Sequence, residues 1–271
     1  MIVKSYSFSI LAASDPFSHV VQHKLFEFEL FGRQMVFSNH MLMVLTAAVL
    51  MVVLFPLVVR QQSIVPRGWK NFLESICVFV REEVVRPALH ENTDRFIKFL
   101  WSIFFFILIC NLLGMVPTDG ILYLLSGRRL EHLGGAATAN IWITGSLACL
   151  SFVMIHVSGI RQQGLWHYIK NFIPHVPFPL IPLMYILEFF GALVKPFALA
   201  IRLFANILAG HTIISAFMGI ALMSRSYSIT GVTLLGCVVM SLLDVFVAFL
   251  QAYIFTFLTT QFIAVAVHPE H

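Results

Sequence analysis

A chain of 271 residues, 59% of them hydrophobic and only 11% charged, has too much apolar surface to bury in one soluble core, so it belongs in a membrane. The formal net charge of +4 is small, and the basic residues lie mostly near the ends of hydrophobic runs, as membrane topology favours. Basic and aromatic residues are not interleaved, which argues against a nucleic-acid partner. The four cysteines show neither metal nor disulfide spacing, and we expect small buried thiols.

Residues 1–40 are predicted to form an outer N-terminal segment. The apolar run at its start is too short and too polar for a signal peptide, so we expect this segment to stay attached. A helical pattern then begins at Asp15 and predicts a short interfacial helix. Its apolar face consists of Phe17, Val20, Val21, Leu25 and Phe28. His19 and His23 are four residues apart, but no third ligand is evident, so we expect a solvated face and no metal.

The first membrane span is predicted over residues 41–60, an apolar run that closes at Arg60. A different pattern follows over residues 66–90, where apolar and charged residues alternate with helical spacing. This alternation predicts an amphipathic helix that lies along the membrane surface. Seven basic residues fall between Arg60 and Lys98, more than in any other connection, so we place this side inside and the N-terminus outside.

Two further spans are predicted within residues 96–158. The second span ends at the sequence Pro117–Gly120, whose proline and glycine are a clear stop signal. The third span, from Thr138 to Ser158, returns the chain to the inside at Arg161. The proline-rich connection from there to Pro179 is predicted to be a rigid loop.

Residues 180–267 are predicted to form a long, tilted hairpin of two helices. The apolar run over residues 180–222 would measure about 60 Å as a helix, against about 30 Å of hydrocarbon, so it must tilt, kink or break. Pro196 is a candidate kink, and a polar turn around Arg225 precedes a second run of similar excess length. The whole chain, residues 1–271, thus predicts a single all-α integral membrane domain with about five membrane helices plus the interfacial amphipathic helix.

Charged residues inside the first hairpin helix are the strongest functional signal. An unpaired arginine at the bilayer centre costs about 2.5 to 3.5 kcal/mol on insertion scales, so it usually marks an ion path or a relay. Glu188, Lys195 and Arg202 are spaced seven apart and Asn206 lies one turn further, so all four fall on one stripe. The alternative is that Lys195 and Arg202 snorkel to a headgroup layer or pair structurally with Glu188. It is weaker because Arg202 has long apolar flanks on both sides.

Polar residues of the two hairpin helices also match in height. If the turn centres on Arg225, residues at equal height have numbers that add up to about 451. Four polar pairs obey this relation: Arg202 with Gln251, His211 with Asp244, Lys195 with Thr256, and Glu188 with Gln261. In hydrocarbon, such meetings satisfy donors and acceptors that would otherwise be costly. The predicted topology places His211 and Asp244 on the outer side of Arg202 and Glu188 on the inner side.

A fixed positive charge between two polar half-paths predicts a mechanism. A guanidinium stays protonated at physiological pH, and it lowers the pKa of a carboxylic acid beside it, so it favours the ionised carboxylate. A partner whose carboxyl group must pass Arg202 would therefore give up its proton first. His211, since an imidazole has an unperturbed pKa of about 6.5, and Asp244 are candidate proton relays on the outer side. The alternative for these two residues is a buried structural pair.

The sequence around these residues resembles subunit a of the F-type ATP synthase, the stator proton-channel subunit. The resemblance covers nearly the whole chain and rests on LVKPFALAIRLFANILAGH, LQAYIFTFLTTQFIAVA with its short HPEH tail, FILICNLLGMVP, and ATANIWITGSLACLSF. It implies that the family's essential arginine is Arg202, its nearby asparagine Asn206, its last-helix glutamine Gln251 and its first-half acidic residue Glu188. The implied role of Arg202 is that of a charge separator facing a carboxylate on the partner ring.

One departure from the family concerns the outer pair. Many bacterial members carry an acidic residue at the position of His211 and a histidine at the position of Asp244. The exchange keeps one imidazole and one carboxylate in the pair, as mitochondrial members do with a glutamate. The resemblance therefore still implies a relay of the same chemistry.

The resemblance implies partners and a location as well. The partners would be a rotating ring of c subunits with one carboxylate each, the peripheral-stalk b subunits and the remainder of the F-type ATP synthase, in an energy-coupling membrane such as the bacterial or mitochondrial inner membrane. This chain would need no cofactor and bind no nucleotide itself, because ATP chemistry lies on other subunits. A stand-alone proton-coupled secondary transporter is the main alternative, weakened by the missing inverted repeat and the overlong hairpin. A haem-binding redox subunit is a third, weakened by the lack of a facing histidine pair.

Overall fold

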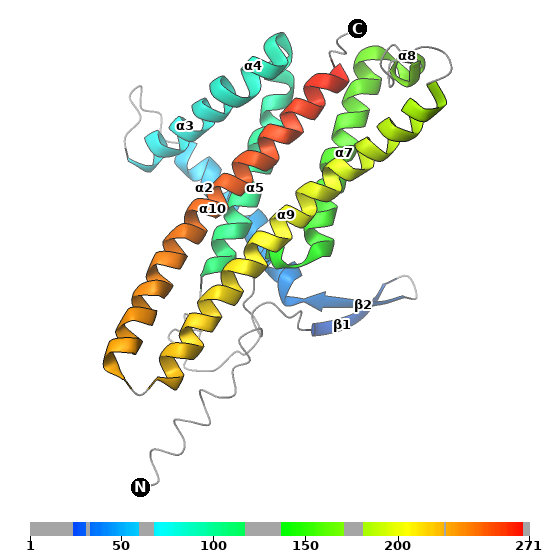
Figure 1. The fold of residues 1–271 in the computed structure, drawn as a ribbon. Coiled ribbons are helices and arrows are strands. Elements are labelled where there is room, and N and C mark those ends of the chain that lie inside the picture. Colours follow the sequence, from blue (N-terminus) through cyan, green and yellow to red (C-terminus); the bar gives the residue numbers. More distant parts are fainter. Residues whose placement is uncertain are drawn as a thin grey trace. The chain divides into compact units, whose positions relative to one another are not determined.

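The computed structural model describes residues 24–30, 33–59, 68–116, 137–170, 181–224 and 226–267 (Figure 1). Its long helices are α2 (Asn39–Val59), α5 (Thr93–Met115), α7 (Ile141–Gln163), α9 (Ile181–Met223) and α10 (Tyr227–Val267). Several predictions fall outside the described residues: the N-terminal segment as far as His23 with its two candidate histidines, the stop at Pro117–Gly120, the loop from residue 171 to Pro179, and the turn at Arg225.

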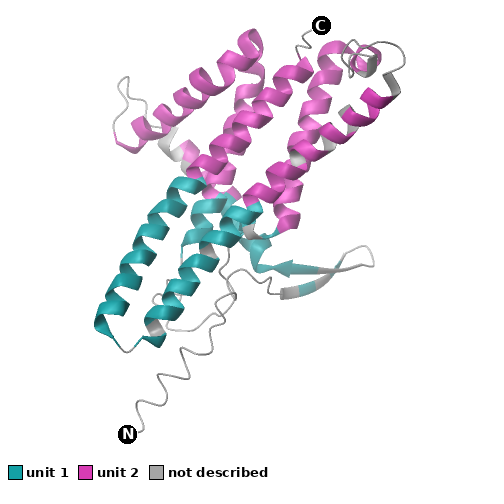
Figure 2. Ribbon diagram, in the orientation of Figure 1, with its two compact units in different colours: residues 1–47, 110–140, 204–248 teal, residues 48–109, 141–203, 249–271 magenta. Residues whose placement is uncertain are grey.

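The chain divides into two compact units (Figure 2). Unit 1 comprises residues 1–47, 110–140 and 204–248, and unit 2 comprises residues 48–109, 141–203 and 249–271. Helices α9 and α10 contribute to both. Unit 1 holds the end of α9 and the start of α10, and unit 2 holds the start of α9 and the end of α10.

The membrane helices follow from uninterrupted apolar sequence. Within the described residues, the stretches long and apolar enough to cross a membrane are Trp69–Met115, Ile141–Gln163, Phe197–Ala221 and Tyr227–Val267, and Asn39–Val53 is a shorter apolar helix. The predicted all-α membrane fold is confirmed. The excess length of the last two helices is confirmed as well: α9 has 43 residues and α10 has 41, about 60 Å each at 1.5 Å per residue.

The predicted interfacial helix beginning at Asp15 is wrong in its described part. Lys24–Leu30 forms strand β1 and pairs antiparallel with β2 (Arg33–Ser38). The physical reason is the period of the pattern: FEFEL, residues 26–30, alternates apolar and polar residues with period two, and RQMVFS follows after two residues that include Gly32. The local alternation favoured a strand, and the longer helical pattern read across it was misleading.

The amphipathic segment begins with α3 (Trp69–Phe79), continues through a π-helical turn (Val80–Val85), and ends in α4 (Arg86–Leu89). The π-helical turn ends two residues before Pro87, which has no N–H to donate, so the regular hydrogen-bond ladder is interrupted there. The chain then reverses into α5 through a 3₁₀ turn (His90–Asn92). An ion pair between Arg81 and Asp94, 2.8 Å, joins the two arms near this corner.

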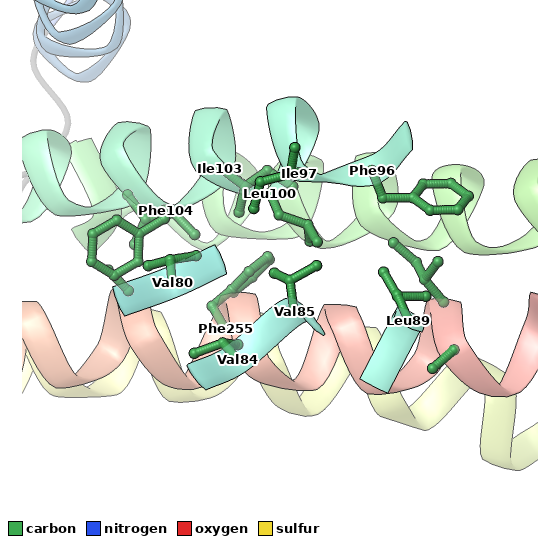
Figure 3. Close-up of a cluster of buried hydrophobic side chains, with 14 of the residues drawn as sticks. Val80, Val84, Val85, Leu89, Phe96, Ile97, Leu100, Ile103, Phe104 and Phe255 are labelled. Atoms are coloured by element: carbon green, nitrogen blue, oxygen red, sulfur yellow. The ribbon is translucent and has the colours of Figure 1, made fainter. Parts of the chain in front are cut away.

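The apolar face of this segment packs within unit 2. Figure 3 shows Val80, Val85 and Leu89 directed toward α5, and Val84 beside Phe255 of α10 in the same cluster. The four aliphatic residues are each at most 2% exposed. Leu100 and Phe104 of α5 are fully buried opposite them. The helical alternation noted in the sequence therefore reflects packing against other helices of the chain, while the predicted position along the membrane surface stays a prediction.

The segment after α7 is not a loop throughout. Gly164, with φ of 79°, ends α7, and the short helix α8 (Leu165–Lys170) follows. Gln163 donates a hydrogen bond from Nε2 to the carbonyl oxygen of Ala266 at 2.7 Å. A Cβ atom at Gly159 would overlap the ring of Tyr168 and lie 3.0 Å from the same carbonyl oxygen. Helix α7 therefore packs closely against the end of α10 within unit 2.

Candidate functional site

Arg202 lies on the part of α9 that belongs to unit 2. Its neighbours Leu199 and Leu203 are buried, at 2% and 0% exposed, in one cluster with Ala252 and Phe255 of α10. Arg202 itself is exposed. Its guanidinium forms no hydrogen bond or ion pair with any residue that the structure describes. Helix α9 is thus anchored by its leucines while it presents the arginine away from the core.

Lys195 does not face the partner that the sequence predicted. Its ammonium nitrogen lies 5.2 Å from the centroid of the Phe262 ring, and the predicted meeting with Thr256 is wrong. The Thr256 hydroxyl is buried and has no hydrogen-bond partner within the described part of the chain. The numbers of Lys195 and Phe262 add up to 457, so the register here has drifted by six residues from the predicted 451.

Gln251 and Glu188 also belong to unit 2. Gln251 is 2% exposed on α10. Whether residues at equal height have numbers that add up to 451 or to 457, Gln251 lies within about a turn of the height of Arg202. Glu188 lies on α9, seven residues before Lys195, but its side chain is outside the described part of the structure. The predicted meeting of Glu188 with Gln261 therefore remains a prediction.

In unit 1 the predicted register holds near the turn. The Thr230 hydroxyl donates to the carbonyl oxygen of Ala221 at 3.4 Å, and the Cys237 thiol lies 3.9 Å from the carbonyl oxygen of Ile214. Both pairs of numbers add up to 451, as predicted.

Asp244 lies against the backbone of α9 at Gly210. A Cβ atom built at Gly210 would be 2.7 and 2.8 Å from the two carboxylate oxygens of Asp244. The absence of a side chain at residue 210 is what makes room for the half-buried carboxylate. His211 is the next residue of α9, so the backbone places it at the height of Asp244. The side chain of His211 is outside the described part of the structure, and the predicted pair stays a prediction.

Asn206 is half-buried on the part of α9 that belongs to unit 1. Its place one turn after Arg202 along a continuous helix is as predicted.

Unit 1 contains a buried polar cluster that the sequence reasoning missed. Asn111 of α5 is 0% exposed, donates from Nδ2 to the carbonyl oxygen of Ala248 at 3.4 Å, and accepts from the Thr138 hydroxyl at 3.0 Å. Ala248 is one turn beyond Asp244 on α10. The available signal was a lone asparagine in an apolar run, because a polar side chain at membrane depth is rare unless it has a partner.

Within the described residues no group of three or more His, Cys, Asp and Glu side chains is arranged to hold a metal ion.

These features define an integral membrane protein in which an arginine, a carboxylate and an amide lie on two overlong apolar helices. Residues 41–264 match the family of the ATP synthase A chain. The chain is 35% identical to the ATP synthase subunit a of Chloroherpeton thalassium, over 95% of this chain and 78% of that protein. It is 38% identical to the subunit a of an Anaeromyxobacter species over 95% of this chain, although it spans only 61% of that relative's length.

A third relative, the ATP synthase subunit a 2 of Chlorobaculum tepidum, is 34% identical over 92% of this chain and 71% of its own length. The chain belongs to the ATP synthase subunit a family, and the resemblance noted in the sequence is confirmed. The alternative of a stand-alone secondary transporter is not favoured.

Proposed function

We propose that this chain is the proton-translocating stator subunit of an F-type ATP synthase, in which Arg202 separates two half-paths for protons. The observation that carries the proposal is the state of Arg202, a permanent charge exposed on α9 without an ion pair among the described residues. A charge of this kind at membrane depth is stabilised when a partner of opposite charge reaches it. That partner is a carboxylate on another subunit.

The surface around Arg202 suits a partner helix. Ala198 is exposed and lies one turn before Arg202, on the same stripe of α9. Small residues let two helices approach closely in a membrane. A ring of c subunits, each carrying one carboxylate on a helix, could pass this stripe closely enough for its carboxylate to meet the guanidinium.

The mechanism follows from the charge. A protonated carboxylic acid gains little from Arg202, whereas a carboxylate gains a charge-assisted hydrogen bond, so each ring carboxyl group is deprotonated as it approaches. On the outer side, Asp244 and His211 would exchange protons with the ring. On the inner side, Glu188 would do so. Gln251, buried within about a turn of Arg202, would hydrogen-bond the passing carboxylate.

The same function defines the other partners and the membrane. A stator needs a fixed attachment while the ring turns, which the peripheral-stalk b subunits and the remainder of the F-type complex would provide. The membrane would be one that holds a proton gradient, such as the bacterial or mitochondrial inner membrane. The chain itself would neither bind nor hydrolyse nucleotide.

The test replaces Arg202 in the assembled complex. Arg202→Ala should lower proton-driven ATP synthesis by about a hundredfold or more, because an interaction of several kcal/mol with the ring carboxylate is lost. Arg202→Lys should be nearly as low, since a compact ammonium lacks the spread of a guanidinium. Lys195→Ala is the matched control, because it removes a second exposed cation from the same helix, and most of its synthesis should remain.

Assembly is measured by co-purification of the ring and stalk subunits in mild detergent. Arg202→Ala complexes should assemble normally, since no described residue depends on the guanidinium. Wild-type rates of synthesis in Arg202→Ala membranes would overturn the proposal, as would a wild-type chain that never co-purifies with a ring.

A further inference from the structure

Three buried hydroxyl groups of unit 2 have no hydrogen-bond partner among the residues that the structure describes. They belong to Ser151 of α7 and to Thr256 and Thr259 of α10, which are 1%, 1% and 0% exposed. A helical serine or threonine in apolar surroundings normally donates to the carbonyl oxygen one turn earlier. Ser158 and Thr260, close by on the same two helices, do so at 2.6 and 2.8 Å. The three unpartnered hydroxyls therefore depart from the behaviour of their own neighbours.

The three hydroxyls lie in one layer of unit 2. Figure 1 shows α7 and the end of α10 running in the same direction, and the carbonyl oxygen of Ala266 is fixed beside Gly159. Gly159 is therefore level with Ala266. Eight residues earlier on each helix, Ser151 is level with residue 258. At 1.5 Å per residue, Thr259 lies about 1.5 Å and Thr256 about 3 Å from that height.

This layer begins at the height of Arg202. The contact between Lys195 and Phe262 sets the local register of α9 against α10. By that register Thr256 is level with residue 201, beside Arg202, and Thr259 is level with residue 198, one turn toward Lys195. The hydroxyls thus extend from Arg202 toward the end of the helices where Glu188 lies, the side that the topology predicts to be inside.

An unpartnered hydroxyl in a buried layer is unfavourable, and water is the small molecule that commonly satisfies such groups. Water bound by two or more hydroxyls also forms a path along which protons pass by exchange of hydrogen bonds. We propose that Ser151, Thr256 and Thr259 hold a short chain of water that carries protons between the ring carboxylate at Arg202 and the inner side. This inference rests on the proposed function and assigns further positioning residues to its inner half-path.

The decisive pair of variants changes one residue in opposite ways. Thr259→Val keeps the shape of the side chain and removes the hydroxyl, whereas Thr259→Ser keeps the hydroxyl and removes a methyl group. If Thr259 binds water, Thr259→Val should lower the rate of ATP-driven proton pumping by about five- to tenfold, the effect of one lost hydrogen bond, and Thr259→Ser should keep it. If Thr259 serves packing alone, the valine variant should pump normally.

Two more variants complete the experiment. Ser151→Ala removes a single oxygen atom, should assemble in any case, and should lower pumping by a similar factor. Thr260→Val is the matched control, because that hydroxyl is already satisfied by the carbonyl oxygen of Thr256, and its pumping should not change. Rates are measured with the whole complex in inverted membrane vesicles and divided by the amount of assembled complex.

The outcomes separate cleanly. Normal pumping by both Ser151→Ala and Thr259→Val would overturn the inference, and so would an equal loss in Thr260→Val. Failure of the wild-type complex to pump would instead count against the proposed function. If Thr259→Val does not assemble, Ser151→Ala decides, since a normal rate in that variant rejects the water chain and a reduced rate supports it.

Discussion

Replacing Gly210 by alanine tests the place of Asp244 on the outer half-path. The new Cβ atom would lie 2.7 Å from one carboxylate oxygen, and real Cβ contacts essentially never fall under 3.0 Å. The Asp244 carboxylate must therefore move by at least about 0.3 Å, the difference between these two distances, and by about 0.7 Å to reach ordinary contact at 3.4 Å. Misplacing a reacting group by 1 Å can cost about a hundredfold in rate, so we expect proton pumping to fall by about tenfold.

The stability of the Gly210→Ala complex should rise slightly or stay unchanged. Alanine favours a helix over glycine by about 1 kcal/mol, which offsets the cost of about 0.5 to 1.5 kcal/mol for a displaced Asp244 rotamer. Assembly of Gly210→Ala should thus stay close to wild type while pumping per assembled complex falls.

Gly219→Ala supplies the matched control for this experiment. It places the same methyl group on the same helix, at a site with nothing within 4 Å. ATP-driven acidification of inverted vesicles, divided by the amount of complex, compares the variants directly. Equal pumping by Gly210→Ala and Gly219→Ala would refute the role assigned to the Asp244 carboxylate.

Asp244→Asn and His211→Ala should each slow proton entry, and the double variant should lose much less than the sum of the two single losses. The exchange His211→Glu with Asp244→His should recover part of the rate. Strictly additive losses in pumping per complex would contradict a shared relay. Asn111→Ala leaves buried polar partners behind, so the thermal stability of the complex should fall by about 1 kcal/mol, and an unchanged melting temperature would count against this cluster as a structural element. Cysteines at the exposed positions Glu74 and Glu83 should react with impermeant thiol reagents added from the inside, and labelling from the outside alone would reverse the topology.

The exposed Arg202 and the buried Leu199 and Leu203 of the same helix show how the tertiary structure completes a site that the sequence only suggests. The sequence placed a guanidinium inside an apolar run, and its cost in hydrocarbon already indicated function. Leu199 and Leu203, buried in the core of unit 2, decide which way α9 is rotated. That rotation leaves Arg202 exposed, where we propose that a partner passes.

Sequence alone determined the membrane class, the excess length of α9 and α10, and the antiparallel register close to their turn, because all three depend on hydrophobicity and helical rise along a single stretch of chain. The contact of Lys195 with Phe262, the space that Gly210 leaves for Asp244, and the unpartnered hydroxyl of Thr259 came only from the tertiary structure. Each of these depends on the crossing and rotation of packed helices, which small differences in side-chain volume set and which no local pattern records. The β1–β2 hairpin was missed for the converse reason, since a period of two over five residues of β1 was outweighed by a longer helical pattern.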